Sequence, residues 1–208
     1  MASMPPELGT PHVHPTHPTH ALRLGLISDT HIPEARDALW PQVFEAFRGV
    51  DAILHAGDIH DLSVIDALHA VAPTYAARGN GDDGSGSRVL QPDHPQLRPA
   101  WLLEFQGVRI GVIHAVPLPE HEYVAAPVEP VLLRMFGRTD LDVLVFGDSH
   151  VEAIFDLRGM LCVNPGSPTL PRQRLTTLGT IGFLDIVDGR ASASLWQLTE
   201  DGIVPHAG

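Results

Sequence analysis

The sequence predicts an α/β fold in which two β-sheets pack face to face as a sandwich, with helices on the outside. One observation is the strand–helix–strand–helix–strand order of residues 22–78, whose short connections indicate a parallel sheet covered by helices. A second is the series of short apolar segments after residue 100, several joined by hairpin turns, which predicts mainly antiparallel pairing. We therefore expect a βαβαβ first half and a mainly antiparallel second half.

Three apolar runs and two amphipathic stretches make up the first half. The predicted strands cover 22–27, 51–55 and 73–78, and the predicted helices cover 37–48 and a segment that begins at Asp61. Apolar residues recur at every fourth position along the first helix, and Asp61 is a residue type that commonly caps a helix. A polar turn follows each strand, and in a parallel sheet these turns lie at one edge.

The second half follows a loop at 81–99 that is rich in Gly, Ser, Asp and Pro. A hairpin is predicted from 101–105 and 108–113, because Gln106-Gly107 separates two strand-like runs. A helix is expected within 127–137. The remaining predicted strands cover 142–146, 152–157, 161–163, 181–187 and 191–198. Cys162 lies in one of the apolar runs, so we expect it in the core.

The composition excludes several classes of function. All 13 basic residues are arginine, which excludes a P-loop lysine and Schiff-base chemistry. The formal charge of −12 disfavours a broad nucleic-acid or membrane footprint, and one cysteine cannot form an intrachain disulfide. No apolar run approaches the roughly 20 residues needed to cross a bilayer, and no leader opens the chain, so we expect a cytoplasmic protein.

The domain organisation is predicted to be simple. Residues 1–21, rich in His and Pro, are expected to form a disordered tail, and 22–208 a single domain. The sequence leaves open whether the protein forms a homo-oligomer.

Five polar clusters follow predicted strands. They are Asp29-Thr30-His31, Gly57-Asp58, Gly79-Asn80, His114, and Gly147-Asp148-Ser149-His150. Each alone has an ordinary structural explanation as a helix cap, a turn or a hydrogen-bonded histidine. Together they supply the mixed oxygen and nitrogen donors that a pair of divalent ions requires, and the Asp58 carboxylate could bridge two ions. Gly79 to Gly84 also matches the dinucleotide motif G-x-G-x-x-G, but two aspartates in the loop would repel a pyrophosphate.

In this order the clusters resemble the calcineurin-like metallophosphoesterase superfamily, specifically its small single-domain bacterial and archaeal phosphodiesterase branch. The resemblance covers about 22–198 and includes His55 and the run Asn164-Pro165-Gly166-Ser167. It implies the two-sheet metallophosphoesterase fold and two divalent ions. One ion would be held by Asp29, His31, Asp58 and His150, and the other by Asp58, Asn80, His114 and Asp148. Manganese is the favoured metal, with Fe, Ni, Co, Zn or Mg as alternatives.

Two positions depart from the family pattern. Asp148 stands where relatives have the first histidine of their last motif, and Gly81 stands where many place a histidine that protonates the leaving group. Glycine cannot donate that proton, so Asp82 is our candidate catalytic residue beside Asn80, with Asp83, His55, His60 or a water as alternatives.

The predicted function is phosphodiester hydrolysis by a hydroxide that bridges two ions, on a small phosphoester substrate. Ser167, in the turn at 164–167, and Arg172, which follows it, are candidate substrate contacts, because the resemblance implies that this turn lies near the site and arginine suits phosphate. Three alternatives remain open: a phosphomonoesterase of the same mechanism, a binding scaffold with weakened catalysis, and a nucleotide-binding protein without hydrolysis.

Overall fold

Two β-sheets and three α-helices form the part of the chain described by the computed structural model, which covers residues 11–13, 21–117, 127–172 and 178–206. The seven-stranded sheet has the order β13-β12-β11-β2-β3-β4-β5. Its strands are β2 (Leu22–Ile27), β3 (Ala52–His55), β4 (Thr74–Ala77), β5 (Leu97–Arg98), β11 (Thr180–Val187), β12 (Arg190–Thr199) and β13 (Gly202–Pro205).

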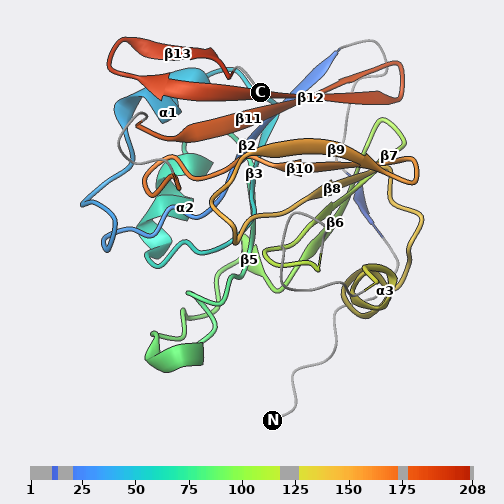
Figure 1. Cartoon of the computed structure of the whole chain (residues 1–208), viewed down its shortest axis with the longest axis horizontal. Helices are drawn as coiled ribbons and strands as arrows, with labels where there is room; N and C mark the ends of the chain where they lie inside the picture. Colours follow the sequence, from blue (N-terminus) through green and yellow to red (C-terminus); the bar gives the residue numbers. More distant parts are fainter. Residues whose placement is uncertain (1–10, 14–20, 118–126, 173–177, 207–208) are drawn as a thin grey trace.

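The six-stranded sheet has the order β1-β6-β7-β8-β10-β9 and stacks against the first (Figure 1). Its strands are β1 (His12–Val13), β6 (Trp101–Phe105), β7 (Val108–Val112), β8 (Val143–Val145), β9 (Ala153–Leu157) and β10 (Met160–Asn164). The helices are α1 (Pro41–Ala46), α2 (Leu62–His69) and α3 (Glu129–Phe136), and a 3-10 turn, η1, spans Ser85–Ser87.

Three buried apolar clusters hold the layers together and confirm the predicted sandwich. The central cluster lies between the two sheets and includes Leu24 and Phe105. A second packs α1 and α2 on the seven-stranded sheet, with Val43 among its members, and a third packs α3 on the six-stranded sheet. Cys162 is buried in the third cluster, as expected. Because the helices lie on opposite outer faces (Figure 1), the layers follow the order helix, sheet, sheet, helix.

The parallel first half has the predicted register. β2 pairs with β3 and β3 pairs with β4, all parallel, so that the carboxyl ends of the three strands open on one edge. α2 begins where expected, because the Asp61 carboxylate accepts a 2.8 Å hydrogen bond from Ser63 N. α1 is shorter than its predicted 37–48 and starts at Pro41, whose fixed φ suits a first helical position.

The second half is less uniformly antiparallel than predicted. The β6–β7 and β11–β12 hairpins are antiparallel as expected. β8, however, runs parallel to both β7 and β10. A parallel connection needs a crossover, and α3 lies within the one that joins β7 to β8. The short strands β5 and β13 were not predicted, because two to four residues carry too little periodicity to be recognised.

The N-terminal segment also differs from the expectation of a tail that does not pack. His12–Val13 form β1, which pairs with β6 in parallel. The His12 ring lies 5.6 Å from the Tyr75 ring and 6.1 Å from the Trp101 ring. β1 thereby covers an edge of the six-stranded sheet that would otherwise present unpaired backbone groups.

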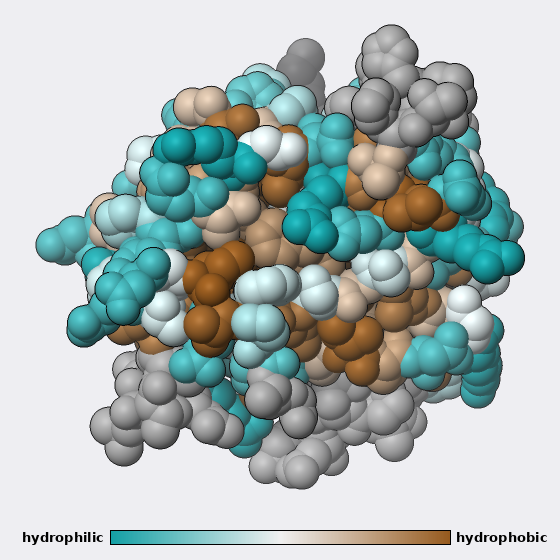
Figure 2. All heavy atoms as spheres, turned by 90° about the horizontal axis from the view of Figure 1, so that it is seen from above, coloured by the Kyte–Doolittle hydropathy of each residue, from teal (hydrophilic) through white to brown (hydrophobic). Residues whose placement is uncertain are grey.

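The face nearest β12 and β13 carries several brown apolar areas interrupted by white and teal polar ones (Figure 2). Among the described residues, no helix combines the length and the apolar character needed to cross a membrane.

Candidate metal centre

The loops that follow the strands meet at one edge of the sandwich, as the sequence predicted. Asp29 follows β2 and Asp58 follows β3, and the loops are joined because Asp29 N donates to Gly57 O at 2.9 Å. The loops after β7 and β8 are joined in the same way, by a 2.9 Å hydrogen bond from Gly147 N to His114 O. The backbone therefore fixes these loops relative to one another before any side chain contributes.

Several side chains of these loops are held on strained backbone. Six non-glycine residues with positive φ lie in the strand-end loops: Asp29, His31, Asp58, His60, Asp148 and His150, with φ between 44° and 73°. This region of φ costs an ordinary L-residue roughly 1–2 kcal/mol. Such strain persists where the surrounding structure enforces it, and its clustering at one edge of the sheets indicates a functional site rather than ordinary turns.

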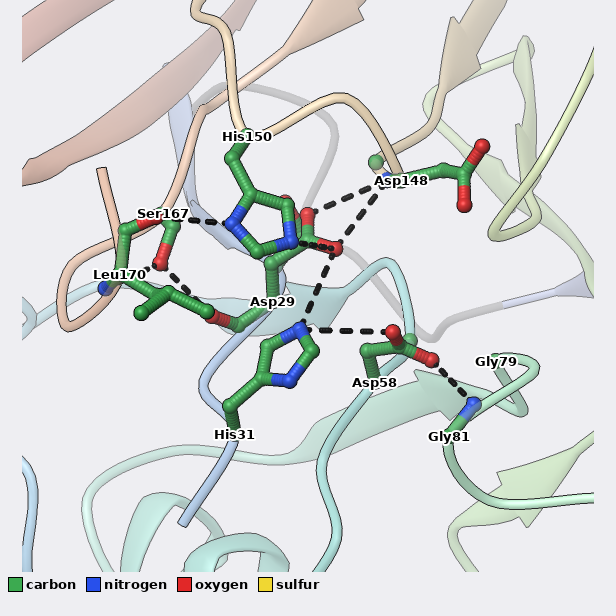
Figure 3. A network of polar contacts seen from close by, with 12 residues as sticks. Asp29, His31, Asp58, Gly79, Gly81, Asp148, His150, Ser167 and Leu170 are labelled. Atoms are coloured by element: carbon green, nitrogen blue, oxygen red, sulfur yellow. Dashed lines mark hydrogen bonds and ion pairs between the residues drawn. The ribbon is translucent and has the colours of Figure 1, made fainter. Parts of the chain in front are cut away.

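Asp29, His31 and His150 form the first group of facing donors, and Figure 3 shows their side chains turned toward one another. Asp29 is fully buried, and its Oδ1 lies 3.5 Å from His150 Nε2 and 4.0 Å from His31 Nε2. The Asp148 backbone N donates to both Asp29 oxygens at 3.2 Å. The Asp29 carboxylate is thus fixed with one oxygen facing two imidazoles.

Asn80, His114 and Asp148 form the second group. His114 Nε2 lies 3.3 Å from Asp58 Oδ1 and 3.5 Å from Asp148 Oδ1. One end of the Asn80 amide lies 3.0 Å from His114 Nε2 and 3.3 Å from Asp148 Oδ1. The side chain of Asp148 is 40% exposed and still reaches this group.

Asp58 lies between the two groups. Its Oδ2 is 3.3 Å from His31 Nε2, whereas its Oδ1 is 3.3 Å from His114 Nε2. Gly81 N donates to Oδ1 at 2.6 Å. A Cβ on Gly79 would lie 2.2 Å from the same oxygen, so only glycine allows the chain to pass this close. The two carboxylate oxygens therefore face different sets of donors.

The separations fit ligands that share an ion. Donor atoms bound to one ion at ~2.1 Å lie roughly 3.0 Å apart in octahedral geometry and 3.4 Å apart in tetrahedral geometry. The distances of 3.0–3.5 Å between His114, Asn80, Asp58 and Asp148 are close to these values. Carboxylates and imidazoles are the donors that first-row divalent metals take in such sites.

Two histidines have their tautomers fixed by carbonyl groups. His114 Nδ1 donates to Ala56 O at 2.7 Å, and His150 Nδ1 donates to Leu170 O at 2.7 Å. Since a carbonyl only accepts, each Nδ1 carries the proton in the neutral ring and leaves the Nε2 lone pair facing the carboxylates. Backbone partners of this kind orient histidines for metal binding.

Burial and neighbouring charges shift the pKa values of three residues of the site. Burial raises the pKa of Asp29 to about 6, because the buried carboxylate loses its hydration. It lowers the pKa of His31 to about 3, so this imidazole is neutral and its lone pair is available. For His114, burial acts in the opposite direction, but the hydrogen bond to Asp148 and the charges of Asp29 and Asp58 raise the pKa to about 9. A cation at the site would replace the proton on His114.

Asp82, our candidate catalytic residue, has surroundings that indicate a structural role. Its carboxylate is fully buried, and its oxygens accept hydrogen bonds from the backbone N–H groups of Ile59, His60 and Gly79 at 2.8–3.2 Å. These contacts connect the loop after β3 to the end of β4. They give Asp82 a positioning role, since its oxygens are already used by the backbone.

Ser167 likewise supports the site instead of facing a substrate. The hydroxyl is buried and donates to Asp29 O at 2.7 Å, while it accepts from Leu170 N at 2.8 Å. Thr169 Oγ1 donates to Thr30 O at 2.6 Å, so the turn that follows β10 braces the backbone of the first motif. Arg172 is exposed at the end of this segment, and its expected role as a substrate contact stays a prediction.

Arg88 is a candidate functional residue that sequence reasoning missed. Its Nη1 lies 2.6 Å from the second end of the Asn80 amide. Hydrogen bonding favours the orientation in which the Asn80 oxygen faces Arg88 and the Asn80 nitrogen faces Asp148. An ion beside His114 would favour the opposite orientation, because the amide oxygen, and not the nitrogen, is a metal ligand. Arg88 is the only arginine in 81–97, and this isolated cation in a Gly- and Asp-rich loop was the available signal.

Comparison with known proteins identifies the family. Residues 22–189 match the model of the calcineurin-like phosphoesterase superfamily domain. The chain belongs to this superfamily. A probable metallophosphoesterase of Methanocaldococcus jannaschii, MJ0623, is 31% identical in an alignment of 188 residues that covers 86% of this chain and 89% of the relative. A probable metallophosphoesterase of Methanothermobacter thermautotrophicus is 37% identical over 150 residues, 72% of this chain and 78% of the relative. The resemblance stated from the motifs is therefore confirmed.

Solved structures of other proteins share the fold. Vacuolar protein sorting 29 (Vps29) of Cryptosporidium parvum superposes with a TM-score of 0.66 at 20% identity, covering 88% of this chain and 95% of that one. Vps29 of Entamoeba histolytica, solved in complex with zinc, gives a TM-score of 0.63 at 20% identity, covering 89% and 97%. Our chain is thus a metallophosphoesterase-superfamily protein with candidate ligand clusters for divalent metal at the expected edge.

Proposed function

We propose that this protein hydrolyses phosphodiesters with two divalent ions bound at the candidate metal centre. The observation that carries the proposal is the placement of Asp58, with one oxygen 3.3 Å from His31 Nε2 and the other 3.3 Å from His114 Nε2. A carboxylate in this arrangement can bridge two ions. A relative named phosphodiesterase MJ0936, of Methanocaldococcus jannaschii, is 24% identical over 79% of this chain and supports a diester as the substrate.

The ligands divide into two sets that share Asp58. Asp29, His31 and His150 would hold one ion, and Asn80, His114 and Asp148 the other. When bound, such ions polarise the phosphoryl oxygens and lower the pKa of a water between them. The donor set mixes carboxylates with imidazoles, and we propose manganese as the working metal, because it accepts both kinds of ligand.

The protein's own residues bind and orient the substrate. The Arg88 guanidinium lies beside Asn80 at the rim, where its fork of N–H donors can hold a phosphoryl oxygen. The Asn80 amide nitrogen can donate to a second oxygen when its own oxygen is a ligand. Asp82 and Ser167 keep the loops in place from behind. Gly81 has no side chain that could donate a proton. The carboxylates of its neighbours are engaged by the backbone: Asp82 accepts from His60 N at 2.8 Å, and Asp83 accepts from Ser85 N at 2.8 Å.

The test is hydrolysis of bis-p-nitrophenyl phosphate and p-nitrophenyl phosphate by metal-stripped protein supplied separately with Mn²⁺, Mg²⁺, Fe²⁺, Co²⁺, Ni²⁺ and Zn²⁺. The nitrophenolate leaves without an acid, so Gly81 cannot conceal activity. We expect turnover of the diester that saturates near two equivalents of metal. Preference for the monoester would establish a phosphatase instead. Metal binding without turnover of either ester would favour the scaffold alternative.

A further inference from the structure

His60 is a buried histidine beside the metal centre that the family pattern does not use as a ligand. Its side chain is only 6% exposed, and its Nε2 is buried with no hydrogen-bond partner among the described residues. His31 Nε2, which faces Asp58, is also buried without a hydrogen bond in the described part of the chain. Leaving a buried nitrogen without a hydrogen-bond partner is unfavourable, so a native site normally supplies one.

Gly81 shows where the His60 ring points. A Cβ built on Gly81 would lie 2.1 Å from His60 Nε2 and 2.9 Å from Asp58 Oδ1. His60 therefore fills the space that a side chain at position 81 would occupy, next to the carboxylate that separates the two ligand groups. The glycine at 81 and the histidine at 60 depend on each other, because any larger residue at 81 would displace the imidazole.

Ring geometry relates His60 to the first ligand group. His31, Asp58 and His60 each offer a donor atom within 4.8 Å of the other two. The His31 and His60 ring centroids are 4.3 Å apart, and the His31 and His150 centroids are 4.8 Å apart. Two imidazoles bound at adjacent positions on one ion at ~2.1 Å have centroids roughly 4.6 Å apart. Both pairs of rings are close to this value.

The surroundings of His60 hold it in one orientation. Its backbone N donates to Asp82 Oδ1 at 2.8 Å, and its carbonyl accepts from Gln91 Nε2 at 2.6 Å. On the far side of the ring, Nδ1 lies 3.4 Å from Glu34 Oε2. A carboxylate on the outer nitrogen of a histidine is a common arrangement in metal sites, because it fixes the tautomer and raises the basicity of the inner nitrogen.

We propose that His60 Nε2 is an additional ligand of the ion held by Asp29, His31, Asp58 and His150. The inference rests on the metal binding of the proposed function and adds a third imidazole to that ion. A further nitrogen donor disfavours Mg²⁺ and suits first-row transition ions. With five protein ligands against four at the other position, this ion binds first and dissociates last.

Cobalt(II) binding to the full chain tests the assignment without relying on activity. Metal-stripped wild type, His60→Ala and His60→Gln are titrated with Co²⁺ by calorimetry. The number of imidazoles per cobalt is measured by X-ray absorption at one equivalent. His69→Ala is the matched control, since it removes an exposed imidazole on α2. Unfolding midpoints are measured for all variants to check that each is folded, and the glutamine variant replaces most of the volume of the imidazole.

We expect the first cobalt to bind at least ~10-fold more weakly in both His60 variants, with the imidazole count falling from three to two, and no change in His69→Ala. Unchanged affinity and an unchanged count in the His60 variants would overturn the assignment, even if turnover of esters with poor leaving groups fell. Unchanged metal binding together with slower turnover of esters with poor leaving groups would make His60 a proton donor instead. If wild type binds no cobalt, the proposed function fails as well, which separates the two conclusions.

Discussion

At the scale of single residues, the candidate metal centre contains carboxylates whose amides could not replace them as ligands. Asp58 faces His31 with one oxygen and His114 with the other, and both side-chain contacts are 3.3 Å. An amide in its place keeps one oxygen donor and presents an NH₂ group on the other side, which cannot be a ligand. The loss therefore affects both groups of donors through a single atom.

Asp58→Asn should abolish turnover of bis-p-nitrophenyl phosphate, with a loss of at least ~10³-fold, and should weaken both metal-binding steps. Turnover is measured at saturating metal, and the two affinities come from calorimetry. The control is Asp83→Asn, an exposed carboxylate in the neighbouring loop. A rate within threefold of wild type in Asp58→Asn would exclude a mechanism in which two ions share this carboxylate.

Arg88 carries a separate prediction about substrate binding. The exposed guanidinium lies 2.6 Å from the Asn80 amide, and the described contacts do not join it to a candidate carboxylate ligand. Its removal should therefore weaken binding of the phosphoester more than binding of the metal. We expect Arg88→Ala to raise KM for bis-p-nitrophenyl phosphate roughly 10-fold, in line with the loss of a charge-assisted hydrogen bond. Metal affinity should stay unchanged. Arg48→Ala, on an exposed turn after α1, is the control, and an equal KM in both variants would exclude the role.

At the scale of elements, the loops after β3 and β4 act as one unit because Asp82 connects them. Its carboxylate accepts from three backbone N–H groups that belong to both loops. An asparagine there directs an NH₂ group at backbone donors that need an acceptor. We expect Asp82→Asn to lower the free energy of unfolding by roughly 2–3 kcal/mol, measured in urea at pH 7 with metal removed. Asp83→Asn should change it by less than about 0.5 kcal/mol. Equal stability of the two variants would restore Asp82 as a candidate catalytic residue.

The order of the elements and the place where the candidate ligands gather could be predicted, because both depend on local pattern. Apolar runs followed by Asp-x-His or Gly-Asp identify a strand and its functional loop together. Asp82 and Ser167 could not be assigned in this way, since a carboxylate or hydroxyl that satisfies buried backbone looks the same in sequence as one that meets substrate. Arg88 was missed, and His60 was considered only as an alternative proton donor. The contact of Arg88 with Asn80 and the position of the His60 ring beside Gly81 depend on how the loops fold.

At the scale of the whole molecule, the candidate site weakens the fold on which it is built. The strand-end loops hold several left-handed residues and buried polar groups, among them Asp29 and His31. Such groups reduce stability unless they are satisfied, and bound ions would satisfy the donors at the site. The fold offsets this cost through its three apolar clusters, and both sheets contribute strands to the edge where the loops meet.

The stability of the protein should consequently depend on pH through His55. This histidine is completely buried: Gly57 N donates to its Nδ1 at 3.1 Å, and Thr30 Oγ1 lies 3.1 Å from its Nε2, so the neutral ring bridges two of the motif loops. Burial is the main cause that lowers its pKa from 6.5 to about 3. In the unfolded chain the ring takes up a proton below pH ~6.5, whereas the folded protein takes it up only near pH 3.

The His55 contribution is therefore complete above pH 6.5 and is lost as the pH falls toward 3. The expected loss is about 1.4 kcal/mol per pH unit, or roughly 2 kcal/mol at pH 5. The lowered pKa of His31 changes the stability with pH in the same direction, whereas the raised pKa of Asp29 changes it in the opposite direction. The effect of His55 is therefore measured as the difference between wild type and a His55 variant. Urea unfolding of wild type and His55→Gln in EDTA should give stabilities that converge by about 2 kcal/mol between pH 7 and pH 5. Parallel curves over this range would show that His55 is protonated in the folded state as readily as in the unfolded one.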